Sequence, residues 1–147
     1  MVFFTRELFL GGQPDSGWER RAAREWNRAR DTYTRYLEVI SPLLPASVRR
    51  LCADGLHDGV IRSASHRSGE LVLVLDMAGA IGRFLGRPVR LTFRGVGDRL
   101  RTSHLADQWW LYEEAHLRPR GRFGLHVLLD KDELEIDAGE LVIDRVK

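Results

Sequence analysis

Cysteine and long apolar runs are scarce in this sequence, and each scarcity excludes a class of protein. The single cysteine, Cys52, cannot form an internal disulfide, which excludes a disulfide scaffold and favours a reducing cytosol. No apolar run approaches the roughly 18 residues of a membrane-spanning helix. Glu7 interrupts the short apolar amino terminus, which is untypical of a secretory signal. We therefore expect a cytoplasmic protein without a membrane span.

The usual catalytic and metal-binding motifs are also missing. The sequence contains no glycine-rich phosphate-binding loop and no nucleophile elbow. Its five histidines show no HxH, HExxH or HxxxH spacing, and Cys52 has no CxxC partner. These absences predict no cofactor, no metal and no catalytic residues that local pattern could identify.

The composition is that of one ordinary globular domain over residues 1–147, with 44% apolar and 30% charged residues. The net charge of +2 does not demand a polyanionic partner. The charges are nevertheless segregated, because 83–101 is rich in arginine and 130–147 is rich in acids. These two segments either face each other or form two poles of the surface.

A helical section is predicted over residues 1–55. An apolar arm, 1–13, precedes a capping box formed by Ser16 and Glu19, for which Asp15 is an alternative cap. Steps of three and four then indicate a helix of about 25 residues, which Pro42 and Pro45 bound. Its apolar positions are Trp18, Ala22, Trp26, Ala29, Tyr33, Leu37, Ile40 and Leu44. A short second helix is expected over 45–53, with Gly55 as its stop.

The periodicity changes from 3.6 to 2 in residues 56–147, which predicts about six strands. Short links between consecutive strands require antiparallel pairing. We expect a terminal hairpin between 134–137 and 140–146, with its turn at Ala138-Gly139. The fold class is therefore α+β, with a long amphipathic helix and a short second helix packed on a mostly antiparallel sheet.

Several polar residues are candidates for a site. His57 and Asp58 open a strand, so their side chains are expected on opposite faces, and Asp58 is expected to bind backbone N–H groups. Strand alternation groups Trp110, Tyr112, Glu114 and His116 on one face and Trp109, Leu111, Glu113, Ala115 and Leu117 on the other.

Two further expectations follow from this alternation. Glu113 lies on an otherwise apolar face, so it needs a partner, for which an arginine from 90–101 is the obvious candidate. His126 can meet Glu114 or His116 across a strand pair, as a functional cluster or as part of a solvent-facing polar row.

A family resemblance rests on segments that occur in a fixed order. They are FFTRELFLG near the amino terminus, LHDGVI at 56–61, LVLVLD at 71–76, LTFRGV at 91–96, WWLYEE at 109–114 and FGLHVLL at 123–129. Together they resemble an uncharacterised family of bacterial cytosolic proteins, a domain of unknown function. The β half is also similar to immunity proteins of bacterial polymorphic-toxin systems. The matching positions are Leu56, His57, Asp58, Phe93, Val96, Trp110, Tyr112, Glu113 and His126.

The leading hypothesis is a non-enzymatic cytosolic module that binds another protein, as an immunity-like protein or an adaptor. Tryptophan and arginine are enriched at interface hot spots. The expected interface therefore lies on the long helix, at Trp18, Arg20, Arg24, Trp26 and Arg28.

Three alternatives stay open. The first is a small enzyme with a site between the helical half and the sheet, formed by His57, Asp58, Glu114 and His126. The second is nucleic-acid binding through the arginine-rich helix, which the interspersed acids disfavour. The third is self-association through that helix.

Overall fold

The computed structural model describes residues 1–11, 19–80 and 86–146 and confirms the α+β class. The helices come first in the chain: α1 (Arg6–Gly11), α2 (Glu19–Ile40) and α3 (Ala46–Asp54), with a 3₁₀ turn at Ser41–Leu43. The strands are β1 (Gly59–Arg67), β2 (Glu70–Asp76), β3 (Val89–Arg94), β4 (Trp109–Leu117), β5 (Phe123–Leu129), β6 (Glu133–Ala138) and β7 (Glu140–Arg145). They form one sheet in the order β6-β5-β4-β1-β2-β3-β7, and every neighbouring pair is antiparallel.

The two predicted helices are present. α2 ends at Ile40, because Pro42 has no N–H to continue the α-helical pattern and the chain makes a 3₁₀ turn instead. α3 ends where Gly55 adopts a positive φ of 66°, which glycine tolerates best. Ser16, Asp15 and Trp18 lie outside the described residues. The expected arm differs from the structure at 6–11, which form the short helix α1.

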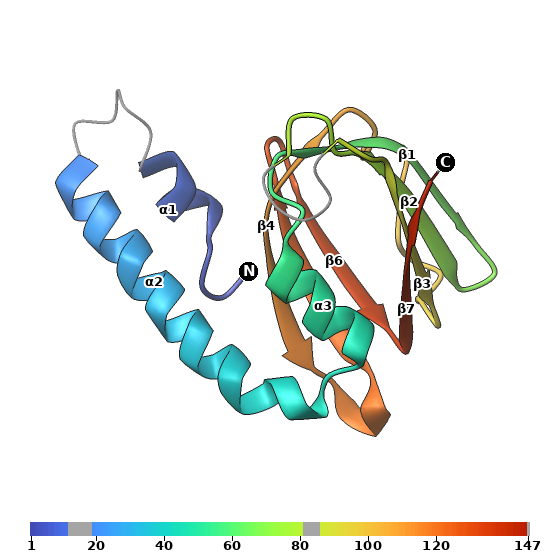
Figure 1. The fold of residues 1–147 in the computed structure, drawn as a ribbon, viewed down its shortest axis with the longest axis horizontal. Coiled ribbons are helices and arrows are strands. Elements are labelled where there is room, and N and C mark those ends of the chain that lie inside the picture. The colour runs from blue at the N-terminus through green and yellow to red at the C-terminus, as the bar shows by residue number, and fades with distance from the viewer. Residues whose placement is uncertain (12–18, 81–85, 147) are drawn as a thin grey trace.

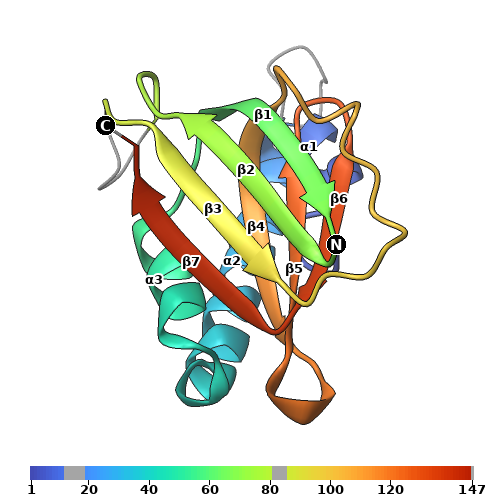
Figure 2. The same cartoon turned by 90° about the vertical axis from the view of Figure 1, so that its right-hand side faces the viewer.

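The sheet is strongly curved, and α3 packs against its concave side (Figure 1). Val48 and Leu51 of α3 are fully buried, together with Leu73, Leu91 and Leu125 of the sheet. Figure 2 shows β1, β2, β3 and β7 crossing in front of β4, β5 and β6. The core is therefore enclosed between the rolled sheet and α3.

The predicted terminal hairpin is wrong, because β6 and β7 lie at opposite ends of the strand order. β6 pairs with β5, whereas β7 pairs with β3 from Val89↔Arg145 to Arg94↔Glu140. Gly139, the residue between them, donates its N–H to the carbonyl of Arg94 at 2.9 Å. Curvature brings the two ends of the sheet together at this corner, so a one-residue link joins two strands that do not pair with each other.

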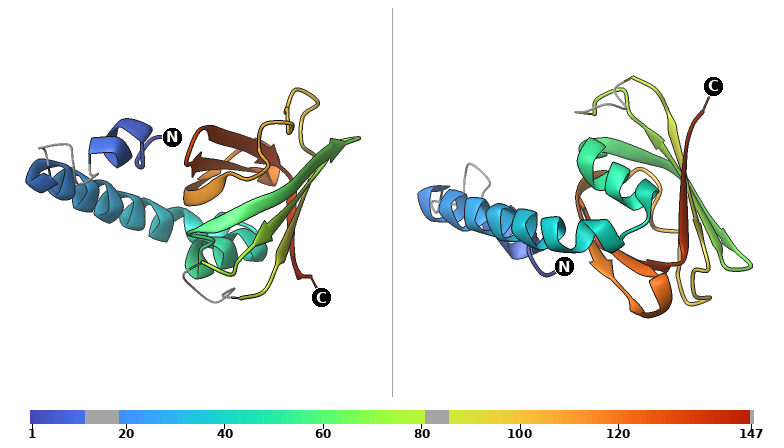
Figure 3. Two further views of the ribbon diagram at one scale, coloured as in Figure 1. Left: turned by 90° about the horizontal axis from the view of Figure 1, so that it is seen from above. Right: turned by 60° about the horizontal axis from the view of Figure 1, so that its bottom comes forward.

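α1 and α2 form a helical layer outside the sheet. The carboxyl end of α2 lies near α3, whereas its amino end extends away from the sheet with α1 beside it (Figure 3). None of the helices described is both long and apolar enough to cross a membrane.

Candidate functional site

An irregularity at Leu111 sets the direction of the side chains on β4. Trp110 lies opposite Leu129 and Tyr112 lies opposite Leu128, so Leu111 has no counterpart on β5. Trp110 is fully buried, and its indole N–H donates to Glu113 Oε2 at 2.7 Å. The expected grouping of Trp110 with Glu114 is therefore wrong, because a bulge shifts the alternation by one residue.

The indole of Trp110 also replaces the arginine that we expected beside Glu113. No arginine among the described residues of 90–101 forms an ion pair with Glu113. The uncharged indole N–H of Trp110 binds the carboxyl group instead, so no positive charge balances an ionised Glu113.

Glu114 binds the amino-terminal arm, here residues 1–5, to the sheet. Its carboxylate is fully buried and accepts the backbone N–H groups of Val2, Phe3 and Phe4 at 2.8, 2.7 and 2.6 Å. His116 Nε2 lies 3.3 Å from the same carboxylate. The expected solvent-facing polar row is therefore wrong at this point, because the arm covers it.

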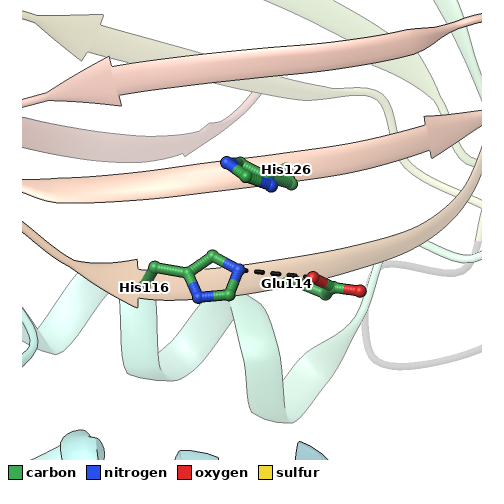
Figure 4. Close-up of side chains that lie close together, drawn as sticks. All are labelled: Glu114, His116 and His126. Atoms are coloured by element: carbon green, nitrogen blue, oxygen red, sulfur yellow. Dashed lines mark hydrogen bonds and ion pairs between the residues drawn. The ribbon is translucent and has the colours of Figure 1, made fainter. Parts of the chain in front are cut away.

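His116 and His126 complete a polar cluster around Glu114, which is one of the two arrangements that strand phase allowed (Figure 4). Glu114 lies directly opposite His126 in the β4–β5 register, and the rings of His116 and His126 are 4.9 Å apart. Tyr36 of α2 places its hydroxyl 3.2 Å from His116 Nδ1. His126 Nε2 lies 3.0 Å from Glu135 Oε1 on β6. The cluster thus joins the arm, α2 and three strands.

The environment shifts two pKa values in this cluster. Burial raises the pKa of Glu114, but the hydrogen bonds from His116 and the three arm amides outweigh it, so the pKa lies below its usual value. Burial lowers the pKa of His126, and His116 adds to this effect against the opposing influence of Glu135. Both shifts favour an ionised Glu114 beside a neutral His126.

A second candidate region lies where β4 separates from β1. These strands pair only at Gly59↔Trp110 and Val60↔Trp109, so the rest of this edge of β4 has no partner among the described strands. The Tyr33 hydroxyl of α2 accepts the backbone N–H of Ala115 at 2.8 Å in place of a strand partner. A cavity of about 240 Å³ opens beside it, lined by Phe4, Tyr33, Thr34, Leu37, Cys52, Gly55, His57, Leu111, Tyr112 and Glu113.

Burial changes the acid–base behaviour of this cavity. It raises the pKa of Glu113 from 4.5 to about 7, against the opposing effect of the Trp110 hydrogen bond. Burial and the nearby Glu113 raise the pKa of the Cys52 thiol to about 12. Glu113 is therefore poised to exchange a proton near neutrality, whereas Cys52 stays a thiol and is a poor nucleophile.

His57 and Asp58 contact each other, contrary to the expectation that they point to opposite faces. They form the turn before β1, and Asp58 has a φ of 66°. In this left-handed conformation Asp58 Oδ2 lies 3.0 Å from His57 Nδ1. Strand alternation does not apply here, because the strand begins only at Gly59.

The residues predicted for the interface fall on two sides of α2. Arg20, Arg24 and Arg28 are exposed, and no ion pair joins them to another described residue. Trp26 faces the arm and the sheet, with ring centroids 5.2 Å from Phe4 and 4.6 Å from Tyr112. The structure thus brings the three arginines together and separates them from Trp26.

We expect Trp26→Ala to lower the free energy of unfolding by about 2 kcal/mol, because it removes a partly buried aromatic ring that packs on Phe4 and Tyr112. Urea unfolding of both proteins measures the change. Arg24→Ala on the opposite side of α2 is the control and should change stability by less than about 0.5 kcal/mol. An unchanged stability in Trp26→Ala would contradict the packing role.

The sequence pattern did not identify two residues of these candidate sites. Tyr36 and Cys52 occupy apolar helical positions, where burial is the usual explanation. The Tyr36 hydroxyl contacts His116, which lies 80 positions away in the sequence. The pKa of the Cys52 thiol is raised partly by Glu113, which lies on β4. No local signal identifies such pairs.

The fold and the polar cluster around Glu114 define a small α+β protein. Its rolled antiparallel sheet carries a helical layer and an amino-terminal arm that is hydrogen-bonded to Glu114. A family model matches residues 13–137, and the chain belongs to that family, which is described as proteins of unknown function (DUF4085). No curated protein and no solved structure shows significant similarity to the chain.

Proposed function

We propose that this chain is a non-enzymatic module of the bacterial cytosol that binds an acidic surface of another protein through α2. The observation that carries this proposal is a row of exposed arginines, Arg20, Arg24, Arg28 and Arg35, on the side of α2 that faces away from the sheet. These residues recur at four- and seven-residue steps, which places them on one strip of a helix. None of the four forms an ion pair with another described residue.

The structure holds this strip in a fixed position. Trp26, Tyr33 and Tyr36 occupy the other side of α2 and pack on the arm and β4. The amino end of α2 extends beyond the sheet, so its outer side is open to a partner (Figure 3). A preorganised helix loses little conformational freedom on binding.

The charge pattern favours a protein over a nucleic acid. Asp31 and Glu38 interrupt the arginine strip, and the whole chain carries only +2. A phosphate backbone would be repelled by these acids, whereas a protein surface can present both signs. The expected similarity of the strand motifs to immunity proteins is the reason to propose a partner that the module neutralises.

The test compares two triple charge reversals that alter the net charge equally. R20E/R24E/R28E changes the strip, and R67E/R99E/R101E changes exposed arginines in the β half. Each protein is expressed in the native host and cross-linked, and the bound partner is identified and then titrated against the purified proteins. We expect the strip variant to lose at least about tenfold in affinity and the control to keep it.

Three outcomes would contradict the proposal. Equal loss in both variants would indicate a general charge effect, and a nuclease-sensitive complex would indicate a nucleic acid. Sedimentation that shows a dimer dissociated by the strip variant would indicate self-association instead.

A second candidate, a small enzyme that uses acid–base chemistry, is favoured by the cavity between the helices and the sheet. His57 lies 3.0 Å from Asp58, and His57 and Glu113 line the same cavity. A carboxyl group with a pKa of about 7 suits general acid–base catalysis. Glu114 and His126 do not line this cavity, so the site would differ from the one expected. Turnover of a small ester or amide that Glu113→Gln abolishes without unfolding would support this candidate.

A further inference from the structure

Glu114, His116 and His126 bring three metal-ligating groups together on neighbouring strands. One ligand atom from each residue lies within 4.8 Å of the other two. Figure 4 shows both imidazoles on the same side of β4 and β5 as the carboxylate of Glu114. We propose that this cluster binds a divalent first-row transition metal ion such as Zn²⁺ through two imidazoles and one carboxylate. The proposal is independent of the binding role of α2.

The donor set suits this class of ion. Imidazole nitrogen and carboxylate oxygen are ordinary ligands of Zn²⁺, and two histidines with one carboxylate leave positions open for water or a further ligand. A hard ion such as Mg²⁺ or Ca²⁺ prefers oxygen ligands and would be poorly matched.

Each proposed ligand is also held by a second hydrogen-bonding group, as is usual in metal sites. The Tyr36 hydroxyl lies 3.2 Å from Nδ1 of His116, and Nε2 of the same ring faces Glu114. The three arm amides orient the carboxylate of Glu114. Glu135 Oε1 lies 3.0 Å from Nε2 of His126 and orients that ring.

Binding requires only a small rearrangement. The metal ion would replace the contact between His116 Nε2 and Glu114 Oε2, while the amide hydrogen bonds remain. The ring proton of His116 would then sit on Nδ1 and be donated to the hydroxyl oxygen of Tyr36. Arg118 lies 3.3 Å from His126 Nε2, but its charge is already compensated by Glu135 and Asp137 at 3.3 and 3.4 Å.

Calorimetric titration of the whole chain with Zn²⁺ tests the proposal, and Co²⁺ absorption reports the ligand set. We expect one Zn²⁺ per chain and a higher melting temperature on binding. Tyr36→Phe should weaken Zn²⁺ binding by about tenfold, because it removes a group that orients a ligand. His126→Ala and His116→Gln should weaken it further and change the Co²⁺ spectrum.

His104→Ala is the matched control, because His104 is an exposed histidine that pairs with Asp132 away from the cluster. It should leave Zn²⁺ affinity unchanged. Circular dichroism verifies that each variant is folded, and His126→Ala remains informative if His116→Gln unfolds. Absence of Zn²⁺ and Co²⁺ binding by the folded parent would overturn the proposal. Binding that survives both histidine substitutions would overturn it as well.

Discussion

Replacing Glu114 with alanine should lower the free energy of unfolding by about 3 kcal/mol. The carboxylate is fully buried and accepts three backbone N–H groups of the arm. Hydrogen bonds to a charged group each contribute about 1.5–3 kcal/mol, and part of this is recovered when the released amides meet water. The arm should therefore detach, which separates Phe3 from Tyr33 and Tyr36 and separates Phe4 from Trp26.

Urea unfolding measures the change in stability, and amide hydrogen exchange at Val2, Phe3 and Phe4 reports the arm. Both measurements are made in the presence of a chelator, so that metal binding does not contribute. Glu38→Ala is the control, because Glu38 is exposed on α2 away from the cluster, and it should change stability by no more than about 0.5 kcal/mol. Continued protection of the three amides in Glu114→Ala would show that the carboxylate does not hold the arm.

Replacing Glu113 with glutamine should have the opposite effect and stabilise the protein at pH 8. Burial raises the pKa of Glu113 from 4.5 to about 7 in the folded chain. Between these values the folded state binds the proton more tightly than the unfolded state, so stability falls as pH rises. The loss amounts to roughly 3 kcal/mol and is complete above pH 7. Glutamine cannot ionise, and its oxygen still accepts the indole N–H of Trp110.

The measurement is urea unfolding of the parent and Glu113→Gln at pH 4, 6 and 8. The two proteins should be nearly equal at pH 4 and should differ by about 2–3 kcal/mol at pH 8. Glu38→Gln, on the exposed side of α2, removes the same charge without a change in a buried site. A difference between Glu113→Gln and the parent that does not vary with pH would contradict the buried, proton-exchanging carboxyl.

Local patterns were reliable where each residue's environment depends on its near neighbours. The steps of three and four predicted α2, and Pro45 with Gly55 bounded α3 correctly. The change of period at residue 56 predicted the antiparallel strands. Strand phase allowed His126 to meet Glu114 or His116, and the structure places it opposite Glu114, because residues opposite each other on paired strands share a face.

Local patterns failed where one residue changed the geometry. The bulge at Leu111 moved Trp110 into the core beside Glu113. The left-handed conformation of Asp58 brought its carboxylate to His57. Strand alternation applies only to an unbroken strand. A bulge interrupts β4 at Leu111, and His57 and Asp58 lie in a turn before β1.

The sequence by itself determined the α+β class, the position of the long helix and the candidate polar residues, because periodicity and capping act over a few residues. Only the tertiary structure decided that β6 and β7 lie at opposite ends of the sheet, that the arm is latched on Glu114, and that Tyr36 joins the histidine cluster. These features depend on sheet curvature and on contacts between residues 80 or more positions apart. Such contacts form only when the whole chain has folded, so no short-range pattern records them.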